Sequence, residues 1–341
     1  MSRKTIDDVA ALAGVSIKTV SRVLNDEPSV RADTRRRVEE AMAALNYQPS
    51  LHARSLAGRR SSLVGLVYDN PSANYVFAVQ SGAIARCRES KLRLFIQSCD
   101  GLGDRLIGEV LAMVDQTHVD GLVVTPPLSS NAELLGALRR RRLPFVLIAP
   151  DHPVEGAPSV VIDDRAAARE ITEYLIGLGH RHIGFIAGHP EHGSSRMREA
   201  GWRDALAAHG LEPAAHGTAQ GYNTAASGRE AALALLAGDE RPTAIFASND
   251  DMAAGAMLAA HGLGLVLPDD LSIAGFDDTE LAGLIWPPLT TVHQPVYDMA
   301  YRATELLVQL VRGEQPPAAN RLDHRLVERA STGPPRSGPQ G

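Results

Sequence analysis

The sequence predicts an all-α helix-turn-helix head, followed by an α/β body that forms two Rossmann-like lobes. Two observations support this fold class. Residues 5–46 contain three short segments with helical periodicity, separated by a Gly-containing turn and a polar loop. From Ser62 onward, short apolar runs alternate with helical stretches of about 10–15 residues, and there are more such units than one ordinary sheet holds.

The head begins with two helices joined by a tight turn. Four apolar residues recur at the spacing i, i+3, i+4, i+7 and share one helix face: Ile6, Val9, Ala10 and Ala13. Gly14 then breaks the helix, because glycine tolerates the backbone conformation of a tight turn. Ser16 suits the N-cap of the second helix. That helix would bury a second apolar stripe, which consists of Val20, Val23 and Leu24.

A third helix follows the loop of residues 25–30. Its inward face would consist of Val38, Met42 and Leu45. Either Asp33 or Thr34 could cap its first turn. Two short helices around a Gly-containing turn, braced by a third, are typical of a helix-turn-helix.

The second helix would present side chains that suit the major groove of DNA. Its outward residues are Ser16, Ile17, Lys18, Thr19, Ser21 and Arg22. The side chains long enough to reach base edges are those of Ile17, Lys18 and Arg22. The short donors that suit phosphate oxygens are Ser16, Thr19, Ser21 and Asn25. On this pattern alone, a small helical bundle with a polar outer face remains the alternative.

Charge is distributed unevenly along the chain. The 341 residues carry a net charge of −6, but residues 1–60 hold 11 Lys and Arg against 7 Asp and Glu, a net of +4. The remaining residues carry a net of −10. A basic head on an acidic body indicates that only the head touches DNA, because DNA would repel the body.

Cysteine content and hydropathy favour a soluble cytoplasmic protein. Two cysteines, Cys87 and Cys99, do not make a disulfide framework in a chain of this length, which favours a reducing compartment. The N-terminal segment lacks the apolar core of a signal peptide. No stretch approaches the ~18 uninterrupted apolar residues that span a membrane, so no membrane partner is expected.

Residues 47–60 form a linker with a weak helical pattern. Pro49 disfavours helix at the preceding residue, so the third helix must end before it. Ser50 could cap a helix of about two turns that Gly58 ends. Such a short helix is marginal in water because its nucleation is costly, so it would need a packing partner. A plain flexible linker is the alternative.

The body shows the pattern of parallel βαβ units. Its first series of apolar runs comprises SLVGLVYDN, LRLFIQSCD, VDGLVVTPP and LPFVLIAP. After SVVIDD the alternation restarts with RHIGFIAG, PTAIFASN and LSIAGFDD. Continuous apolar strands separated by helices indicate buried parallel sheets, and the number of units favours two lobes. Trp202 and Trp286 are expected to pack inside the body.

Polar residues follow several predicted strands. In open α/β sheets, ligands lie beyond the carboxyl ends of the strands. This rule selects residues 69–77, 150–153, 189–198, 249–250 and 277–278. These segments are rich in Asp, Asn, Arg and aromatic residues. They suit a polyol, because carboxylates and amides hydrogen-bond hydroxyls and an aromatic ring stacks on the apolar face of a pyranose.

Three motifs of the head and linker strongly resemble the LacI/GalR family of transcription regulators. They are VAALAGVSIKTVSRVLN (9–25), VRADTRRRVEEAMAALNYQPS (30–50) and ARSLAG (53–58), and the resemblance extends to about residue 330. It implies a periplasmic-binding-protein-like body and a homodimeric repressor that reads a pseudo-palindromic operator in double-stranded DNA. The C-terminal tail lacks the leucine heptads that would form a tetramer.

The resemblance also implies a control mechanism. A small sugar or glycoside bound between the lobes would release the repressor from an operator of carbohydrate-utilisation genes, because ligand binding and DNA binding are thermodynamically linked. A nucleobase or other non-sugar corepressor is the alternative within the family, and it would strengthen DNA binding instead.

With the resemblance, the chain divides into five parts. Residues 1–46 form the helix-turn-helix domain, and residues 47–60 form the hinge helix or linker. The N-terminal lobe of the body comprises residues 61–161 and 293–320, and the C-terminal lobe comprises residues 162–292 and 321–332. Residues 333–341 are rich in Gly, Pro and Ser and are expected to be disordered.

The resemblance adds residues to the predicted DNA surface. In the head it implies contacts from Thr5, Thr34 and Tyr47 in addition to the second helix. In the linker, Leu56 matches the position of an apolar wedge that intercalates in the minor groove. Ala53 would let two hinge helices approach closely.

For the cleft, the resemblance assigns Arg198, Asn249 and Asp277 to the effector. The predicted set is completed by Tyr75, Phe77, Tyr222 and Gln294. Asn249 and Asp277 could instead be structural helix caps.

The identity of the sugar stays open at one position. Some sugar-binding relatives have an acidic residue at the end of the LPFVLIAP strand, where this chain has Ala149. Asp151 follows two residues later. His189 and His192 lie near the predicted cleft, so one of them could contact the ligand.

The sequence argues against an enzyme. It contains no dinucleotide-binding GxGxxG after a strand, no phosphate-binding GxxxxGK[ST] and no GxSxG nucleophile elbow. The histidines at 180, 182, 189 and 192 lack a recognised zinc spacing, so neither a metal nor a cofactor is expected. A secreted sugar-binding protein would share the two-lobed body, but the basic head argues against that class.

Overall fold

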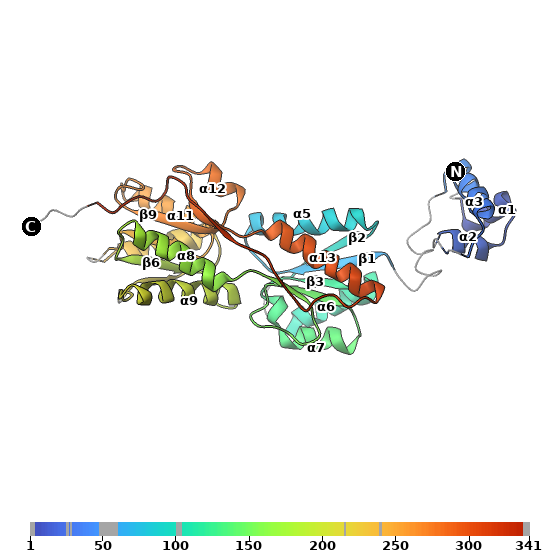
Figure 1. The fold of residues 1–341 in the computed structure, drawn as a ribbon, viewed down its shortest axis with the longest axis horizontal. Coiled ribbons are helices and arrows are strands. Elements are labelled where there is room, and N and C mark those ends of the chain that lie inside the picture. The colour runs from blue at the N-terminus through green and yellow to red at the C-terminus, as the bar shows by residue number, and fades with distance from the viewer. Residues whose placement is uncertain are drawn as a thin grey trace, which may run out of the picture. The chain divides into compact units, whose positions relative to one another are not determined.

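The computed structural model describes residues 4–24, 27, 29–47, 61–99, 104–214, 216–238 and 241–336 (Figure 1). The chain divides into two compact units. The smaller unit is built on the first 63 residues, and its helical part is called the head below; the larger unit is called the body. Within the described part of the chain, every helix is too short or too polar to cross a membrane.

Three helices form the head, as the sequence predicts: α1 (Ile6–Ala13), α2 (Ile17–Leu24) and α3 (Ala32–Ala44). Thr5 forms a capping box with Asp8, and Gly14 ends α1 in the left-handed conformation at φ 62°. Ser16 Oγ accepts a hydrogen bond from the backbone N–H of Thr19 at 3.2 Å and thereby caps α2. The helices bury a common core that includes Val9, Val20, Val38 and Tyr47.

The start of α3 differs from the prediction that Asp33 or Thr34 caps it. The N-cap position is Arg31, which makes no side-chain cap hydrogen bond. Asp33 lies within the first turn, where its carboxylate pairs with Arg36 at 2.6 Å. Negative charge in the first turn interacts favourably with the helix dipole, so Asp33 suits this position without capping the helix.

The first sheet of the body has the strand order β11–β5–β4–β3–β1–β2. Its strands are β1 (Leu63–Tyr68), β2 (Arg93–Ser98), β3 (Leu122–Val124), β4 (Phe145–Ile148), β5 (Ser159–Val161) and β11 (Ala319–Arg321). Helices α5 (Ala73–Glu89) and α13 (Val296–Arg312) cover one face, and α6 (Asp104–Thr117) and α7 (Ala132–Arg140) cover the other (Figure 1). A short 3₁₀ helix, η1 (Leu128–Ser130), precedes α7.

The second sheet has the strand order β12–β10–β9–β8–β6–β7. Its strands are β6 (Ile183–Ala187), β7 (Thr218–Gln220), β8 (Ala244–Ala247), β9 (Ser272–Asp277), β10 (Thr290–His293) and β12 (Arg325–Val327). Helices α8 (Asp164–Gly177) and α9 (Gly193–Ala208) pack on one face, and α10 (Ala225–Leu236) and α11 (Asp250–Gly262) pack on the other. The short helix α12 (Glu280–Leu284) follows β9.

The chain passes between the two sheets three times. The crossings lie between β5 and α8, between β10 and α13, and between β11 and β12. The strands pair in parallel except at one edge, where β12 runs antiparallel to β10. Because the carboxyl ends of parallel strands meet at one edge of a sheet, this topology gathers the loops after β1, β4, β6, β8 and β9.

The two tryptophans have different environments. Trp202 is fully buried and stacks on Phe185 with ring centroids 5.4 Å apart, as expected of a core residue. The expectation that Trp286 also packs inside is wrong, because its side chain is 81% exposed.

Residues 333–336, at the start of the tail whose composition predicts disorder, make specific contacts with the second lobe. The Gly333 carbonyl accepts a hydrogen bond from Ser272 Oγ at 3.1 Å and lies 2.9 Å from the His180 ring. Arg336 forms salt bridges with Asp269 and Asp270. Composition suggests disorder here, but these contacts fix the segment to the second lobe.

Candidate functional site: a DNA-binding head and an inter-lobe cleft

The surface of α2 carries the side chains that the sequence assigns to DNA. Ser16, Lys18 and Arg22 are exposed, and Ile17 is 48% exposed although it is apolar. Thr19 and Ser21 are half-buried. An exposed apolar side chain beside cationic ones suits contact with both base edges and phosphates. Arg22 lies 3.4 Å from Glu27, so this guanidinium already has an acidic neighbour within the head.

The other predicted DNA contacts have varied positions. Thr5 lies at the start of α1, where it forms the capping box, and Thr34 is half-buried on α3. Tyr47 packs in the core of the head and is 8% exposed, so its main contacts are internal. Asn25, Ala53 and Leu56 lie outside the described residues.

In the body, a polar cavity of about 30 Å³ lies between the two sheets at the carboxyl ends of their strands. Five of the seven predicted effector residues line it: Tyr75, Arg198, Asn249, Asp277 and Gln294. Further lining residues are Asn70, Ser72, Ala149, His192, Ser194, Ser195 and Asn223. The cavity is formed by both lobes, since Ser72 and Ala149 belong to the first and Asn249 and Asp277 to the second.

Arg198 is the centre of this cavity. Its Nε donates to Asp164 at 2.8 Å, and its two terminal nitrogens donate to the Ser248 carbonyl at 2.5 Å and to Gln294 Oε1 at 2.9 Å. Asp277 lies 3.6 Å away. The guanidinium also stacks on the Phe276 ring, 3.6 Å from its centroid. A buried charge of this kind is tolerated because each of its three nitrogens donates a hydrogen bond and two carboxyl groups lie beside it.

Burial raises the pKa of three carboxyl groups in this region. Loss of solvation raises the pKa of Asp250 to about 7 and that of Asp277 well above its usual value. It also raises the pKa of Asp164, although Arg198 opposes the shift in both Asp164 and Asp277. Burial lowers the pKa of His192 to about 4, so this ring is neutral at physiological pH.

Asn249 caps a helix as well as lining the cavity, whereas Asp277 caps no helix. Asn249 caps α11 by accepting from the Met252 N–H at 2.9 Å, and it also lines the cavity, so the structural and ligand-facing roles coexist. Asp277 caps no helix, because Thr279 holds the N-cap position of α12. The carboxylate of Asp277 faces Arg198 instead, and its backbone has φ 110°, which is rare for a non-glycine residue.

Direct contacts hold the two lobes together on both sides of the cavity. Ser72 and Asn74, at the start of α5, donate hydrogen bonds to Asp251 at the start of α11. Arg196 on α9 donates to Asp151, which follows β4 and also bonds Ser130 at 2.9 Å. A Cβ at Gly193 would overlap the Asp151 carboxylate, so a larger residue here would displace that side chain.

Two predicted effector residues do not line the cavity. Phe77 and Tyr222 are 71% and 51% exposed. Tyr75 and Phe77 were expected in a loop, but Ser72 caps α5 and places both on the helix. Two residues along a helix is about 200°, so burial of Tyr75 turns Phe77 outward. Tyr222 contacts the His189 ring edge-on at 5.7 Å, outside the cavity.

Comparison with known proteins identifies the family. Bacterial regulatory proteins of the lacI family match residues 5–50, and a periplasmic binding protein-like domain matches residues 172–332. Catabolite control protein A of Priestia megaterium is 35% identical over 332 residues, which cover 96% of this chain and 99% of that protein. The chain belongs to the lacI family of bacterial regulatory proteins.

Two solved structures extend this finding to the fold. The lac repressor dimer bound to operator and the anti-inducer ONPF matches with a TM-score of 0.83 at 31% identity, covering 97% of this chain and all of that one. The complex of the transcriptional regulator CelR with cellobiose matches with a TM-score of 0.72 at 30% identity, covering 96% and 100%. As a member of the lacI family, the chain is a DNA-binding transcriptional repressor that binds an effector.

The sequence did not single out several residues in and beside the cavity. Ser72, Ser195 and Asn223 line the cavity, and Asp164 binds Arg198. Asp164 directly follows SVVID at the first crossing, a position that resembles a domain boundary more than a ligand loop. Ser195 and Arg198 are three residues apart on α9, so helical periodicity around Arg198 could have revealed Ser195.

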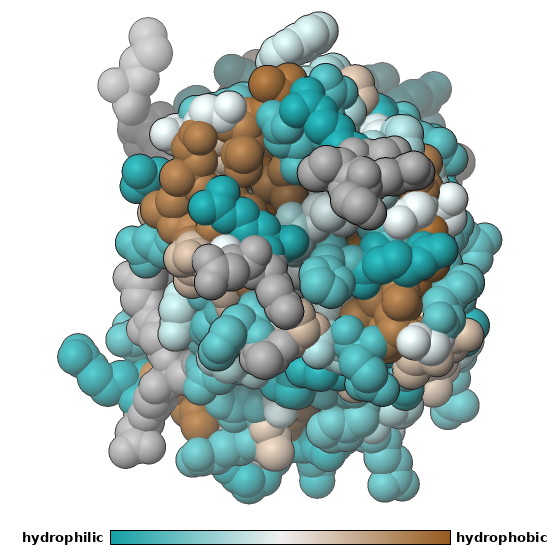
Figure 2. Space-filling view, turned by 90° about the vertical axis from the view of Figure 1, so that its left-hand side faces the viewer, coloured by the Kyte–Doolittle hydropathy of each residue, from teal (hydrophilic) through white to brown (hydrophobic). Residues whose placement is uncertain are grey.

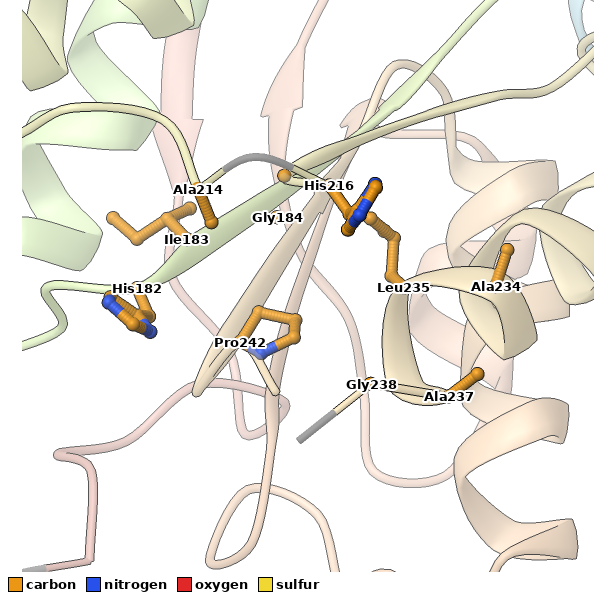
Figure 3. Close-up of a pocket in the computed structure, with 11 residues that line it drawn as sticks. His182, Ile183, Gly184, Ala214, His216, Ala234, Leu235, Ala237, Gly238 and Pro242 are labelled. Carbon is orange, nitrogen blue, oxygen red and sulfur yellow. The ribbon is translucent and has the colours of Figure 1, made fainter. Parts of the chain in front are cut away.

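A larger hollow of about 490 Å³ lies at the other end of the second sheet (Figure 3). It is lined by His182, His216, Ile183, Leu235, Pro242 and several Ala and Gly residues, with no Asp, Glu, Lys or Arg among the described residues that line it. This end of the body faces the viewer in Figure 2, where hydrophobic patches alternate with polar surface. It lies at the amino ends of the strands and holds fewer polar side chains, so it suits a polar ligand less well than the smaller cavity at the carboxyl ends does.

Proposed function

We propose that this repressor controls carbohydrate-utilisation genes and that its effector is a neutral sugar or glycoside bound between the lobes. The buried cluster around Arg198 carries this proposal. It presents carboxylate, amide and hydroxyl groups, the set that recognises vicinal hydroxyls. Arg198 is the only Arg or Lys among the described residues that line the cavity. Because Arg198 is already bonded to Asp164, Ser248 and Gln294, an anionic ligand would have to displace these partners.

The position of Arg198 connects ligand binding to the lobe arrangement. Asp164 follows the first crossing between the lobes, and Gln294 lies in the second. A ligand that replaces either partner of Arg198 changes the contacts of a crossing segment. We propose that the preferred lobe arrangement then shifts and that operator affinity falls by the same factor as the ligand's preference between the two arrangements.

On the DNA side, we propose that Ile17, Lys18 and Arg22 read base edges while Ser16, Thr19 and Ser21 contact phosphates. Arg22 would exchange its contact with Glu27 for DNA. Ala53 and Leu56 would form the hinge that enters the minor groove at the operator centre. The protein would act in the cytoplasm and without enzymatic activity.

We also propose a homodimer. Exposed apolar side chains lie on helices α5 and α13 of the first lobe and near α11 and α12 of the second: Phe77, Tyr297, Leu258, Leu284 and Trp286. Helices α5 and α12 lie along the same side of the body in Figure 1. Exposed apolar patches of this kind mark protein interfaces. Burial of Trp286 against a second copy would explain its exposure in the single chain.

A thermal-shift screen of the full chain tests the proposed effector class. The panel holds mono- and disaccharides, sugar phosphates, hypoxanthine and guanine. A ligand at about 100 times its dissociation constant adds roughly 2.7 kcal/mol to folding stability, so a neutral saccharide should raise Tm by several degrees. The corresponding sugar phosphates should give smaller shifts, because a phosphate would have to displace the partners that Arg198 already binds.

Two variants give the screen a control. Asp277→Asn removes a carboxylate that faces Arg198, and it should abolish the saccharide shift. Arg203→Ala removes an exposed guanidinium on α9, the helix that also carries Arg198. The Arg203 side chain binds Glu199 at 2.7 Å, outside the cavity, so this variant should preserve the shift. A shift with purines alone would overturn the saccharide proposal in favour of a corepressor.

A further inference from the structure

The amino ends of the parallel strands form a surface of each lobe that lies away from the effector cavity. In a βαβ unit the helix runs antiparallel to its strands, so the helices end at this surface. The chain also enters the first lobe here, because β1 begins at Leu63, shortly after the linker. The backbone N–H groups of Ser61 and Ser62 donate to the Asp120 carboxylate at 2.7 and 2.8 Å. These bonds fix the point of entry.

The first lobe carries an excess of cations at this surface. The segments concerned are the last turn of each of its four main helices and the connection to the next strand: residues 86–92, 114–121, 137–144 and 309–318. They are called the basic face below. Together they hold eight Lys and Arg against four Asp and Glu, a net of +4. The largest group of cations is Arg139–Arg142, four consecutive residues at and just after the end of α7.

The second lobe has the opposite charge at its corresponding surface. The same parts of its four main helices and connections are residues 174–182, 205–217, 233–243 and 259–271. They hold two Lys and Arg against five Asp and Glu, a net of −3. The helix dipole favours cations at helix C-termini in both lobes alike, so it does not explain the difference. The cations of the first lobe therefore point to a role of their own.

The acidic groups of the basic face already have partners, whereas several of its cations do not. Asp115 pairs with Arg141 at 2.6 Å. Glu89 pairs with Arg86 at 3.7 Å, and Asp120 binds the backbone of the entering chain. Four exposed cations make no ion pair within the part of the chain that the structure describes: Arg88, Lys91, Arg140 and Arg142. These side chains are available to an external anion.

The cations lie on both sides of the strand through which the chain enters. In the first sheet β2 adjoins β1 on one side, and β3 and then β4 follow on the other. Lys91 precedes β2 and Arg142 precedes β4. With neighbouring strands about 4.8 Å apart, the cations span roughly 15 Å. A DNA duplex carries one phosphate charge per about 1.7 Å of its axis, so a surface of this width can meet several phosphates.

The connection to the head favours DNA as the partner of the basic face. Residues 48–60 can extend at most about 45 Å, so a duplex that the head binds stays tethered to the first lobe. Tethering raises the effective concentration of the phosphates at this surface. The net charge of −10 on the body averages over two lobes of different charge, so the expectation that DNA repels the body does not apply to the basic face.

We propose that the basic face of the first lobe contacts the phosphate backbone of the operator duplex that the head holds. This contact would add affinity without reading sequence, because phosphates are the same at every base pair. It would also orient the body, since the acidic surface of the second lobe would be repelled by the duplex. The contact requires only the DNA-binding activity of the family and is independent of the proposed effector.

Fluorescence anisotropy of the full chain tests this contact, with a labelled duplex that the chain itself enriches from a random-sequence pool. The double variant Arg88→Gln and Arg140→Gln removes two cations that have no ion pair. It should reduce the slope of log affinity against log salt by about 1.8, since each lost phosphate contact contributes roughly 0.9. The loss of affinity should therefore be greatest at low salt and shrink about tenfold between about 50 and 200 mM salt.

The double variant Arg229→Gln and Arg241→Gln is the matched control. Both residues are exposed cations of the second lobe, and the change in net charge is the same. Salt screens charges more than about 10 Å apart at 0.1 M, so this variant should keep the parent slope. As a direct readout, a photocrosslinking amino acid in place of Arg140 should attach to the duplex. The same amino acid in place of Arg229 should not.

Four outcomes would overturn the proposal. A parent slope in the Arg88 and Arg140 variant would leave the basic face to an acidic protein instead. An equal reduction of the slope in both double variants would show that net charge alone is responsible. A loss of affinity by the same factor at every salt concentration would indicate a defect of folding rather than lost phosphate contacts. Equal crosslinking from positions 140 and 229 would show that the duplex does not select this surface.

Discussion

Arg198 links parts of the body that are far apart in sequence. It lies on α9 and bonds Asp164 after the first crossing, Ser248 after β8 and Gln294 in the second crossing. Buried charges that keep their partners are strongly coupled to them, because removal of one partner leaves the other without compensation. The side chains around Arg198 should therefore show strong linkage between protonation and folding.

Asp250 and His192 should give opposite dependences of stability on pH. Asp250 has a pKa of about 7 in the folded chain against 3.8 in the unfolded chain. Its contribution to the free energy of unfolding is therefore full at low pH and is lost as the pH rises toward 7. His192 has a pKa of about 4 when folded against 6.5 when unfolded. Its contribution is present above pH 6.5 and is lost as the pH falls toward 4.

Urea unfolding of the chain and two variants at about pH 5 and 6.5 measures both effects, each up to about 1.36 kcal/mol per pH unit. The stability of the wild type relative to Asp250→Asn should increase as the pH falls. Relative to His192→Gln it should decrease. If both differences stayed constant with pH, neither group would change its protonation on folding.

For single residues, the sequence predicted a position in the cavity best where the residue belongs to a segment that follows a strand. The rule of strand topology selected the segments 189–198, 249–250 and 277–278, and Arg198, Asn249 and Asp277 from these segments line the cavity. Phe77 was assigned to the same site because the start of α5 was not recognised. Asp164 was missed because its partner, Arg198, is 34 residues away and only tertiary structure brings them together.

At the scale of elements, close packing of α10 against α11 depends on small residues. A Cβ at Gly255 on α11 would overlap the Ala225 carbonyl and lie 2.7 Å from the backbone nitrogen of Arg229, both on α10. Gly228 on α10 faces the backbone of Met252 in the same way. The two helices contact each other through their backbones, so no movement of a side chain can make room for an added methyl group.

The two glycines of α11 at positions 255 and 262 should respond oppositely to alanine. Gly255→Ala should destabilise the body by about 1–3 kcal/mol, because it forces the helices apart. Gly262→Ala has no neighbour within 4 Å and should be neutral or stabilise by up to about 1 kcal/mol, because alanine loses less entropy in a helix. Thermal unfolding of both variants measures the difference; equal Tm values would contradict the backbone contact.

Element boundaries depended on caps that the sequence indicates unevenly. The strong signals, Gly14 and Ser16, placed the turn of the head correctly. At α3 the residues Asp33 and Thr34 resemble caps, yet the helix starts before them because Arg31 already adopts the extended N-cap conformation. The presence of a residue that can cap a helix does not show that the helix begins at that residue.

At the scale of the whole molecule, an exposed tryptophan suggests how two chains associate. Trp286→Arg should convert the proposed dimer to a monomer in sedimentation analysis, because an unpaired charge at an interface costs several kcal/mol. The side chain is 81% exposed, so the folded chain should keep its far-UV circular dichroism. Met197→Arg, an exposed apolar residue on α9, should remain dimeric. A dimeric Trp286→Arg would place the interface elsewhere.

The fold class followed from periodicity, whereas the closure of the lobes did not. Apolar strands alternating with helices predict parallel sheets directly, and both sheets are present. The contacts of Asp251 with Ser72 and of Arg196 with Asp151 join residues more than 40 positions apart, and no local pattern indicates them. The exposure of Trp286 was likewise hidden, because an aromatic residue before two prolines resembles a packed turn.

The three crossings between the sheets have a consequence for how such genes recombine. Each lobe is encoded by separate stretches of sequence, because α13 and β11 return to the first sheet and β12 returns to the second. A single exchange between two genes can join a new head to an intact body, but it cannot transfer one lobe without breaking a sheet. A head can thus be paired with a different body in one exchange, whereas the two lobes of a body are inherited together.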